Sequence, residues 1–117
     1  MEKNSAFGLG DATAVEHLEG GVTRKILKYG GKLMLVEVTM PKGGTGSAHK
    51  HPHEQISYIA RGSFEFTVGE EKRVVKAGDS LYVASNVEHG TRSLEDGSIV
   101  VDIFTPCLLY TSPSPRD

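Results

Sequence analysis

Short apolar segments separated by turn-forming residues run through most of the chain. In residues 63–68, Phe64 and Phe66 alternate with Glu65 and Thr67, which is the period-two pattern of a strand that buries one face. Other short segments bounded by glycine or proline predict further strands at residues 22–28, 32–40, 51–60, 73–76, 80–83, 89–94 and 98–104. About eight strands with frequent turns are typical of a β-sandwich or jelly roll, so an all-β fold is predicted.

Two stretches lack the strand pattern. Residues 42–49, KGGTGSAH, contain three glycines and no apolar run, so we expect an irregular loop there. Residues 1–21 are mostly polar, and the helical period at 11–19 is weak, so this segment is interpreted as a lead-in. One β-domain is therefore expected over residues 22–106.

The last eleven residues, CLLYTSPSPRD, interrupt the pattern. Ser and Pro alternate in them, and a tail of this composition usually stays disordered. The same string is obtained by translating one frame of a transposon-end adapter used in DNA sequencing libraries. We therefore expect residues 107–117 to be adapter read-through and not native, with Cys107 and Arg116 carrying no function.

Composition narrows the class of protein. With 117 residues and 38% hydrophobic content, the chain can bury one core and is too short for two ordinary domains. The formal net charge is -2 and no block of Lys and Arg is present, so nucleic acid is not an expected partner. No apolar stretch approaches the ~20 residues of a membrane span, and residues 1–19 lack the apolar core of a secretion signal. No membrane partner is expected, and a cytoplasmic location is the default.

Three of the five histidines lie within HKHPH, at His49, His51 and His53. On an extended strand, positions 49, 51, 53 and 55 share one face, so these imidazoles and the Gln55 amide would point into a single space. His89 would have to arrive from another strand. Imidazole nitrogen is the commonest protein ligand for first-row divalent metals, which favours a metal site over histidines exposed beside a glycine-rich loop.

These residues carry a resemblance to the cupin family. The first cupin motif is matched by Gly43, five residues, His49, one residue, His51, three residues, Gln55, six residues and Gly62. The resemblance implies a single-domain cupin jelly-roll barrel, a double-stranded β-helix. It also implies one divalent transition metal, which could be nickel, zinc, manganese, cobalt or iron.

The second cupin motif is matched from Gly78 through five residues to Ala84, then Asn86, then two residues and His89. Ala84, Asn86 and Ser93 depart from the usual proline, glycine and asparagine. Those positions shape turns and do not bind metal in the family. The resemblance therefore retains every ligand position.

The family pattern assigns the metal ligands to His49, His51, Gln55 and His89. Many cupins have glutamate where this chain has Gln55, so a dication here would not be neutralised by its ligands. We expect weaker metal retention and a stronger Lewis acid toward an anionic oxygen. His53 has the same strand parity as Gln55 and is the alternative ligand.

A finer resemblance links the chain to the small KdgF-type cupins of pectin and alginate breakdown, which linearise unsaturated uronates. It rests on AHKH, HEQISY, GSFE, AGD, SLEDGS and DIFTP at 102–106. In that group an aspartate and a phenylalanine matching Asp102 and Phe104 belong to the active site. The implied activity is ring opening of 4,5-unsaturated monouronates to 5-keto-4-deoxyuronate, with a sugar acid as ligand. A further arginine of that group would fall within residues 107–117.

Several alternatives remain open at the level of sequence. The barrel could house a metal-dependent dioxygenase or another oxidoreductase, or a noncatalytic sugar-acid-binding module. Asp102 could be an exposed strand-end charge and Phe104 a core aromatic, although both share one strand face. Three arginines could bind a carboxylate, although such side chains are more often solvated: Arg24, Arg61 and Arg92.

An outward face is expected on the strand that carries the histidines. Ile56, Tyr58 and Ala60 have the opposite parity to Gln55, so they would lie on the outside of the barrel. Because cupins are often dimers, the resemblance implies a homodimer that covers this apolar face.

Overall fold

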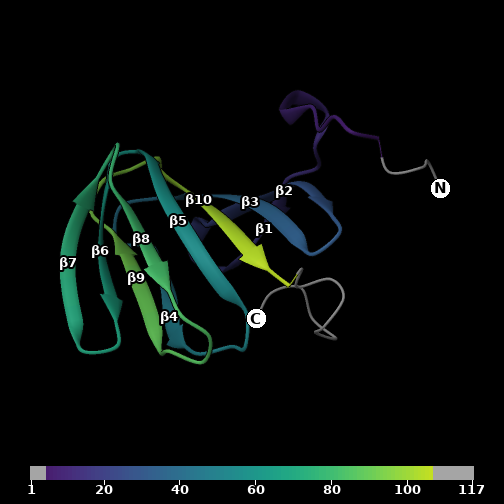
Figure 1. Ribbon diagram of the computed structural model, residues 1–117. Coiled ribbons are helices and arrows are strands. Elements are labelled where there is room, and N and C mark those ends of the chain that lie inside the picture. The colour runs from purple at the N-terminus through teal and green to yellow at the C-terminus, as the bar shows by residue number, and fades with distance from the viewer. Residues whose placement is uncertain (1–4, 107–117) are drawn as a thin grey trace.

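Two antiparallel sheets face each other in the computed structural model, which describes residues 5–106 apart from the side chains of residues 47–49 (Figure 1). The strands are β1 Glu16–His17, β2 Thr23–Gly30, β3 Leu33–Met40, β4 Thr45–His49, β5 Glu54–Arg61, β6 Ser63–Val68, β7 Glu71–Lys76, β8 Ser80–Val83, β9 His89–Ser93 and β10 Ser98–Thr105, with short 3-10 helices η1 Gly10–Ala12 and η2 Glu19–Gly21. One sheet has the order β1-β2-β3-β10-β5-β8 and the other β4-β9-β6-β7. The all-β jelly-roll barrel predicted from the sequence is confirmed.

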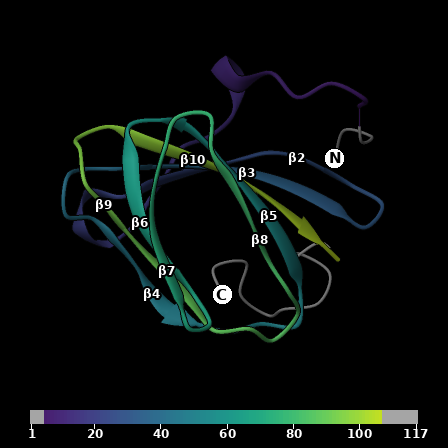
Figure 2. The same ribbon diagram turned by 60° about the vertical axis from the view of Figure 1, so that its left-hand side comes forward.

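The two sheets form opposite walls of the barrel, with β4, β6, β7 and β9 on one side and β3, β5, β8 and β10 on the other (Figure 2). Among residues 5–106 no helix is long and apolar enough to span a membrane. Residues 107–117, where adapter read-through is expected, lie outside the described part of the chain.

The structure corrects two of the predicted boundaries. Residues 42–49 were expected to form a loop, but Thr45–His49 form β4, which pairs with β9. Strand pairing uses backbone N–H and C=O groups, so a glycine-rich segment without apolar side chains can still join a sheet edge. In addition, β5 begins at Glu54, and residues 51–53 lie in the link that precedes it. The histidines at 49, 51 and 53 therefore do not lie on one continuous strand.

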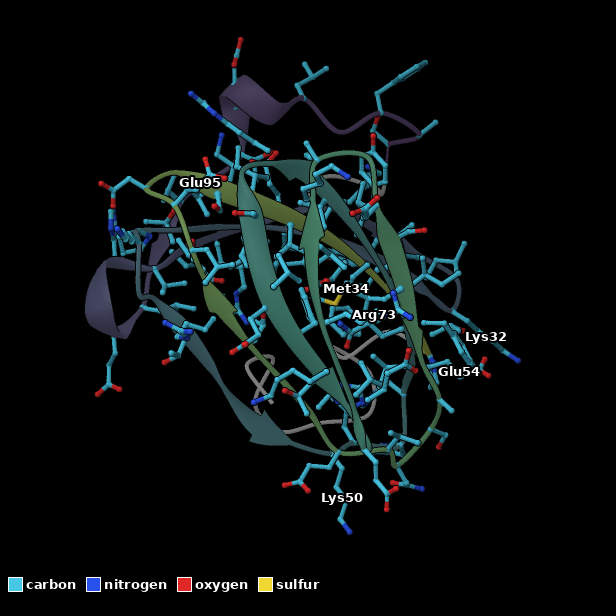
Figure 3. All side chains as sticks on the ribbon, turned by 90° about the vertical axis from the view of Figure 1, so that its left-hand side faces the viewer. Lys32, Met34, Lys50, Glu54, Arg73 and Glu95 are labelled. Carbon is cyan, nitrogen blue, oxygen red and sulfur yellow. The ribbon has the colours of Figure 1, made fainter. Side chains whose placement is uncertain are left out.

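The apolar core fills one end of the barrel. Its buried residues are Val22, Met40, Ile59, Phe64, Phe66 and Val100. A smaller buried cluster of Met34, Val36 and Phe104 lies along β3 and β10. In Figure 3, Met34 lies inside the fold, whereas Lys32 and Lys50 project away from it.

The inner face of β5 changes from apolar to polar toward the second cluster. Ile59 belongs to the core, whereas Ser57 and Gln55, which have the same parity, are buried polar residues. The core therefore closes one end of the barrel and leaves polar side chains inside the other.

A close approach between strands requires glycine at position 62. Gly62 connects β5 to β6 with φ of 74°, in the left-handed region that favours glycine. A Cβ atom at this position would lie 2.9 Å from the Cα of Ser98 and would also collide with its hydroxyl oxygen. Ser98 is completely buried, so it has little room to move.

Gly62→Ala should lower the free energy of unfolding by more than about 2 kcal/mol, because it combines left-handed backbone strain with a clash against Ser98. Gly31→Ala is the matched control, since Gly31 has φ of 56° and its Cβ would meet nothing within 4 Å. It should cost only the backbone strain, about 1–2 kcal/mol. Urea unfolding of both variants measures the difference, and equal losses would contradict the steric argument.

Candidate functional site

A row of buried polar side chains leads into the barrel along β5 and the link before it. His51, His53, Gln55 and Ser57 are 4%, 1%, 5% and 0% exposed, whereas the residues between them are exposed. The period-two alternation thus continues through the link at 51–53. Positions 51, 53 and 55 share one face, although the backbone there is not a regular strand.

His89 reaches this row from the other sheet. It is the first residue of β9, is 5% exposed, and its ring centroid lies 4.9 Å from that of His51. The side chain of His49 lies outside the described residues. Its backbone is the ladder partner of His89, so residue 49 ends β4 next to this cluster.

The orientation of both rings suits metal binding. His51 Nδ1 lies 3.1 Å from the carbonyl oxygen of His53, and His89 Nδ1 lies 3.0 Å from that of Val87. Because a carbonyl oxygen only accepts hydrogen bonds, each Nδ1 carries the proton. In the neutral ring this tautomer leaves the lone pair on Nε2, which is the arrangement found in metal-bound histidines.

The loop between β8 and β9 holds the backbone of residues 51 and 52 in place. The backbone N–H of Asn86 donates to the carbonyl of His51 at 2.7 Å, and the Ser85 hydroxyl donates to the carbonyl of Pro52 at 2.7 Å. Asn86 has φ of 64°, so its position requires the left-handed conformation. Asparagine is among the few other residues that tolerate it, which explains why it can replace the glycine of the cupin motif.

The Gln55 amide belongs to a buried hydrogen-bond network. Its Nε2 lies 2.9 Å from the Ser57 hydroxyl and 3.4 Å from Asp102 Oδ1, and the Ser57 hydroxyl donates to the same Oδ1 at 2.6 Å. The amide nitrogen is therefore engaged, which leaves Oε1 as the end that can bind a cation. His53 is also buried, with its ring centroid 5.3 Å from that of His51.

Ser57 was not singled out in the sequence as a candidate. The same alternation that groups residues 51, 53 and 55 also includes residue 57. A small polar residue at an inward strand position was the available signal.

Asp102 and Phe104 both lie on the inner face of β10. Asp102 is the ladder partner of Ser57, and Phe104 is that of Gln55. The Phe104 ring is 8% exposed, with its centroid 5.9 Å from that of His51. Ile103 between them is 41% exposed on the outer face. The polar network and an aromatic wall thus adjoin the histidines.

The Asp102 carboxyl group is surrounded by protein atoms, although the residue keeps part of its surface exposed. This desolvation raises its pKa to about 6, and the hydrogen bonds from Ser57 and Gln55 oppose the rise. A carboxyl group that titrates near neutral pH is suited to both accepting and donating a proton.

Of the three arginines that could bind a substrate carboxylate, two are paired with glutamates of the chain and one is exposed. Arg24 is buried and its Nε lies 2.7 Å from Glu16 Oε1, on the neighbouring strand β1. Arg92 lies 3.6 Å from Glu65, and Arg61 is exposed. Arg24 and Arg92 thus each have a carboxylate partner within the chain.

The donor set is chemically compatible with a divalent metal. Among the side chains described, no group of three His, Cys, Asp or Glu residues is arranged as a metal site. The expected set, however, includes His49, whose side chain lies outside that description, and Gln55, which is an amide. Two imidazole Nε2 atoms and an amide oxygen are suitable ligands for first-row divalent ions.

Comparisons with known proteins identify the family. A cupin domain model matches residues 36–104. The pectin degradation protein KdgF of Dickeya dadantii (strain 3937) is 44% identical over 101 residues, covering 86% of this chain and 92% of that protein.

Solved structures agree with the family match. The structure of KdgF from Halomonas sp. has a TM-score of 0.83 at 35% identity, covering 86% of this chain and 94% of that one. An RmlC-like cupin from Shewanella frigidimarina also has a TM-score of 0.83, at 36% identity, covering 91% and 95%. A predicted oxalate decarboxylase from Thermotoga maritima, with a TM-score of 0.78 at 19% identity and covering 85% and 97%, shares the fold. The chain therefore belongs to the cupin superfamily, among the small cupins similar to KdgF.

Proposed function

We propose that the protein opens the ring of 4,5-unsaturated monouronates to give 5-keto-4-deoxyuronate during pectin or alginate breakdown, with a divalent metal ion. The observation that carries this proposal is the juxtaposition of His51, His89 and Gln55 with Asp102 and Phe104 inside one barrel. The 44% identity to a pectin degradation protein supports the substrate class.

The reaction is an isomerisation and requires no oxidant or reductant. The substrate is a cyclic enol ether and a hemiacetal, with a carboxylate beside the double bond. A proton leaves the C1 hydroxyl, the bond between C1 and the ring oxygen breaks, and C4 takes up a proton as the C5 ketone forms. The protein must therefore hold the carboxylate and move a proton.

The chain has residues for each of these tasks. His49, His51, Gln55 and His89 would hold a divalent ion, which would supply a Lewis acid for anionic substrate oxygens. Asp102 accepts or donates the proton, and its raised pKa of about 6 suits both roles. Beside it, the ring of Phe104 forms one wall of the sugar site and excludes water.

We expect the metal-loaded protein to accelerate loss of the conjugated double-bond absorbance of unsaturated galacturonate or its alginate-derived counterpart, and a chelator to abolish the effect. Asp102→Asn should lower kcat by about a hundredfold or more, because the amide cannot transfer the proton. Asp11→Asn, at an exposed carboxylate, is the matched control and should retain full activity.

No acceleration with nickel, zinc, manganese or cobalt would reject this function. Uronate binding without product would instead support a noncatalytic sugar-acid-binding module. Oxygen consumption that requires iron would support the dioxygenase or oxidoreductase alternative.

Metal occupancy of two variants distinguishes Gln55 from His53 as the metal ligand. Gln55→Ala should weaken metal affinity at least about tenfold, because it removes a ligand oxygen. His53→Ala should retain the metal, since His51 Nδ1 contacts the backbone carbonyl of residue 53, which alanine keeps. Metal content after dialysis, measured by mass spectrometry, tests both variants. Retention by Gln55→Ala together with loss by His53→Ala would assign the ligand to His53.

We further propose that two copies associate through the outer face of the larger sheet. Ile103, Ile56 and Tyr82 are neighbours in the ladder across β10, β5 and β8, and they are 41%, 50% and 52% exposed. Tyr58, on the same face, is 48% exposed. A second copy packed on this face would bury a continuous row of apolar side chains. Single exposed apolar residues are common on protein surfaces, but a continuous row indicates an interface.

Light scattering after size-exclusion chromatography should give twice the monomer mass for the wild-type protein and the monomer mass for Ile56→Lys, because a buried lysine would lose its hydration. Val74→Lys is the control, since Val74 is 64% exposed on β7 of the other sheet. A monomeric wild type, or the same effect of both variants, would contradict the proposed interface.

A further inference from the structure

The hydroxyl group of Ser57 connects the two functional halves of the site. Ser57 is completely buried on the inner face of β5. Its Oγ lies 2.6 Å from Asp102 Oδ1 and 2.9 Å from Gln55 Nε2. One side chain therefore contacts both a candidate metal ligand and the candidate proton-transfer group.

The direction of the two hydrogen bonds follows from the single hydroxyl proton. Ser57 donates this proton to Asp102, so toward Gln55 it can only accept. Gln55 must then present its NH2 group to Ser57, and the amide oxygen is turned to the opposite side. Without the hydroxyl, the closer of the two contacts of Nε2 is lost, and only the 3.4 Å contact with Asp102 remains.

Strand geometry adds to this constraint. Ser57 is the ladder partner of Asp102, whereas Gln55 lies two residues along the same strand. The Ser57 hydroxyl thus links Asp102, its own ladder partner, to Gln55 of the neighbouring ladder pair through side-chain hydrogen bonds. Because a buried hydroxyl without partners is costly, loss of either hydrogen bond is unfavourable.

We propose that Ser57 is a positioning residue that turns the Gln55 amide oxygen toward the metal and fixes the Asp102 carboxylate in one orientation. This inference rests on the proposed function, since it assumes that Gln55 binds the metal and that Asp102 moves the proton. Ser57 acts through its hydrogen bonds to Gln55 and Asp102.

The first test uses the metal-free protein and does not depend on activity. The side-chain NH2 signals of Gln55, assigned by their absence in Gln55→Ala, are followed by NMR hydrogen exchange. Ser57→Ala should accelerate their exchange at least about tenfold, because the closer partner of Nε2 is gone. Ser57→Thr keeps the hydroxyl and should restore slow exchange.

The second test measures affinity for zinc alone, by competition with a chelator. Ser57→Ala should weaken zinc binding about tenfold, as expected when the partner that orients a ligand is removed. Ser93→Ala is the matched control, because Ser93 is equally buried and donates to the carbonyl of Glu95 at 2.7 Å. It should leave zinc affinity and Gln55 exchange unchanged.

In the enzyme assay, Ser57→Ala should lower kcat more than it raises KM, and Ser57→Thr should recover most of the loss. Unchanged Gln55 exchange and zinc affinity in Ser57→Ala would overturn the inference, as would equal effects of Ser93→Ala. If the wild type binds zinc but does not convert uronates, the proposed function fails. The exchange and affinity tests still decide whether Ser57 orients Gln55.

Discussion

Pairing of β5 with β10 places Ile59 opposite Val100 and Ser57 opposite Asp102, so one pair of strands supplies both the apolar core and the polar site. Inward residues on a strand are two positions, or about 7 Å, apart. A slip of one residue would turn every one of these side chains to the other face. The core therefore fixes the register that brings the polar groups together.

The positions of His51 and His89 depend on hydrogen bonds with the backbone of a loop. The loop between β8 and β9 donates to the carbonyl of His51 through Asn86, and it accepts from the ring of His89 through Val87. Both contacts satisfy buried polar groups, and the contact with Val87 also selects the tautomer of the His89 ring. Stability and the orientation of the candidate ligands thus have a common physical origin.

The cupin fold by itself does not determine the reaction. The structures of KdgF from Halomonas sp. and of a predicted oxalate decarboxylase both share it, with TM-scores of 0.83 and 0.78. The neutral donor set at His51, His89 and Gln55, next to Asp102, carries the functional argument. The raised pKa of Asp102 arises from desolvation, which depends on how the barrel encloses the carboxyl group.

The sequence by itself determined the strands with clear alternation and the shared parity of residues 51, 53 and 55, because period two is a local property of the chain. It missed β4, whose pairing uses backbone groups, and it extended β5 too far toward the histidines. Only the tertiary structure decided that His89 meets His51 and that Ser57 joins Gln55 to Asp102. Which side chains on different strands meet depends on the strand register, and the packing of the whole barrel sets that register.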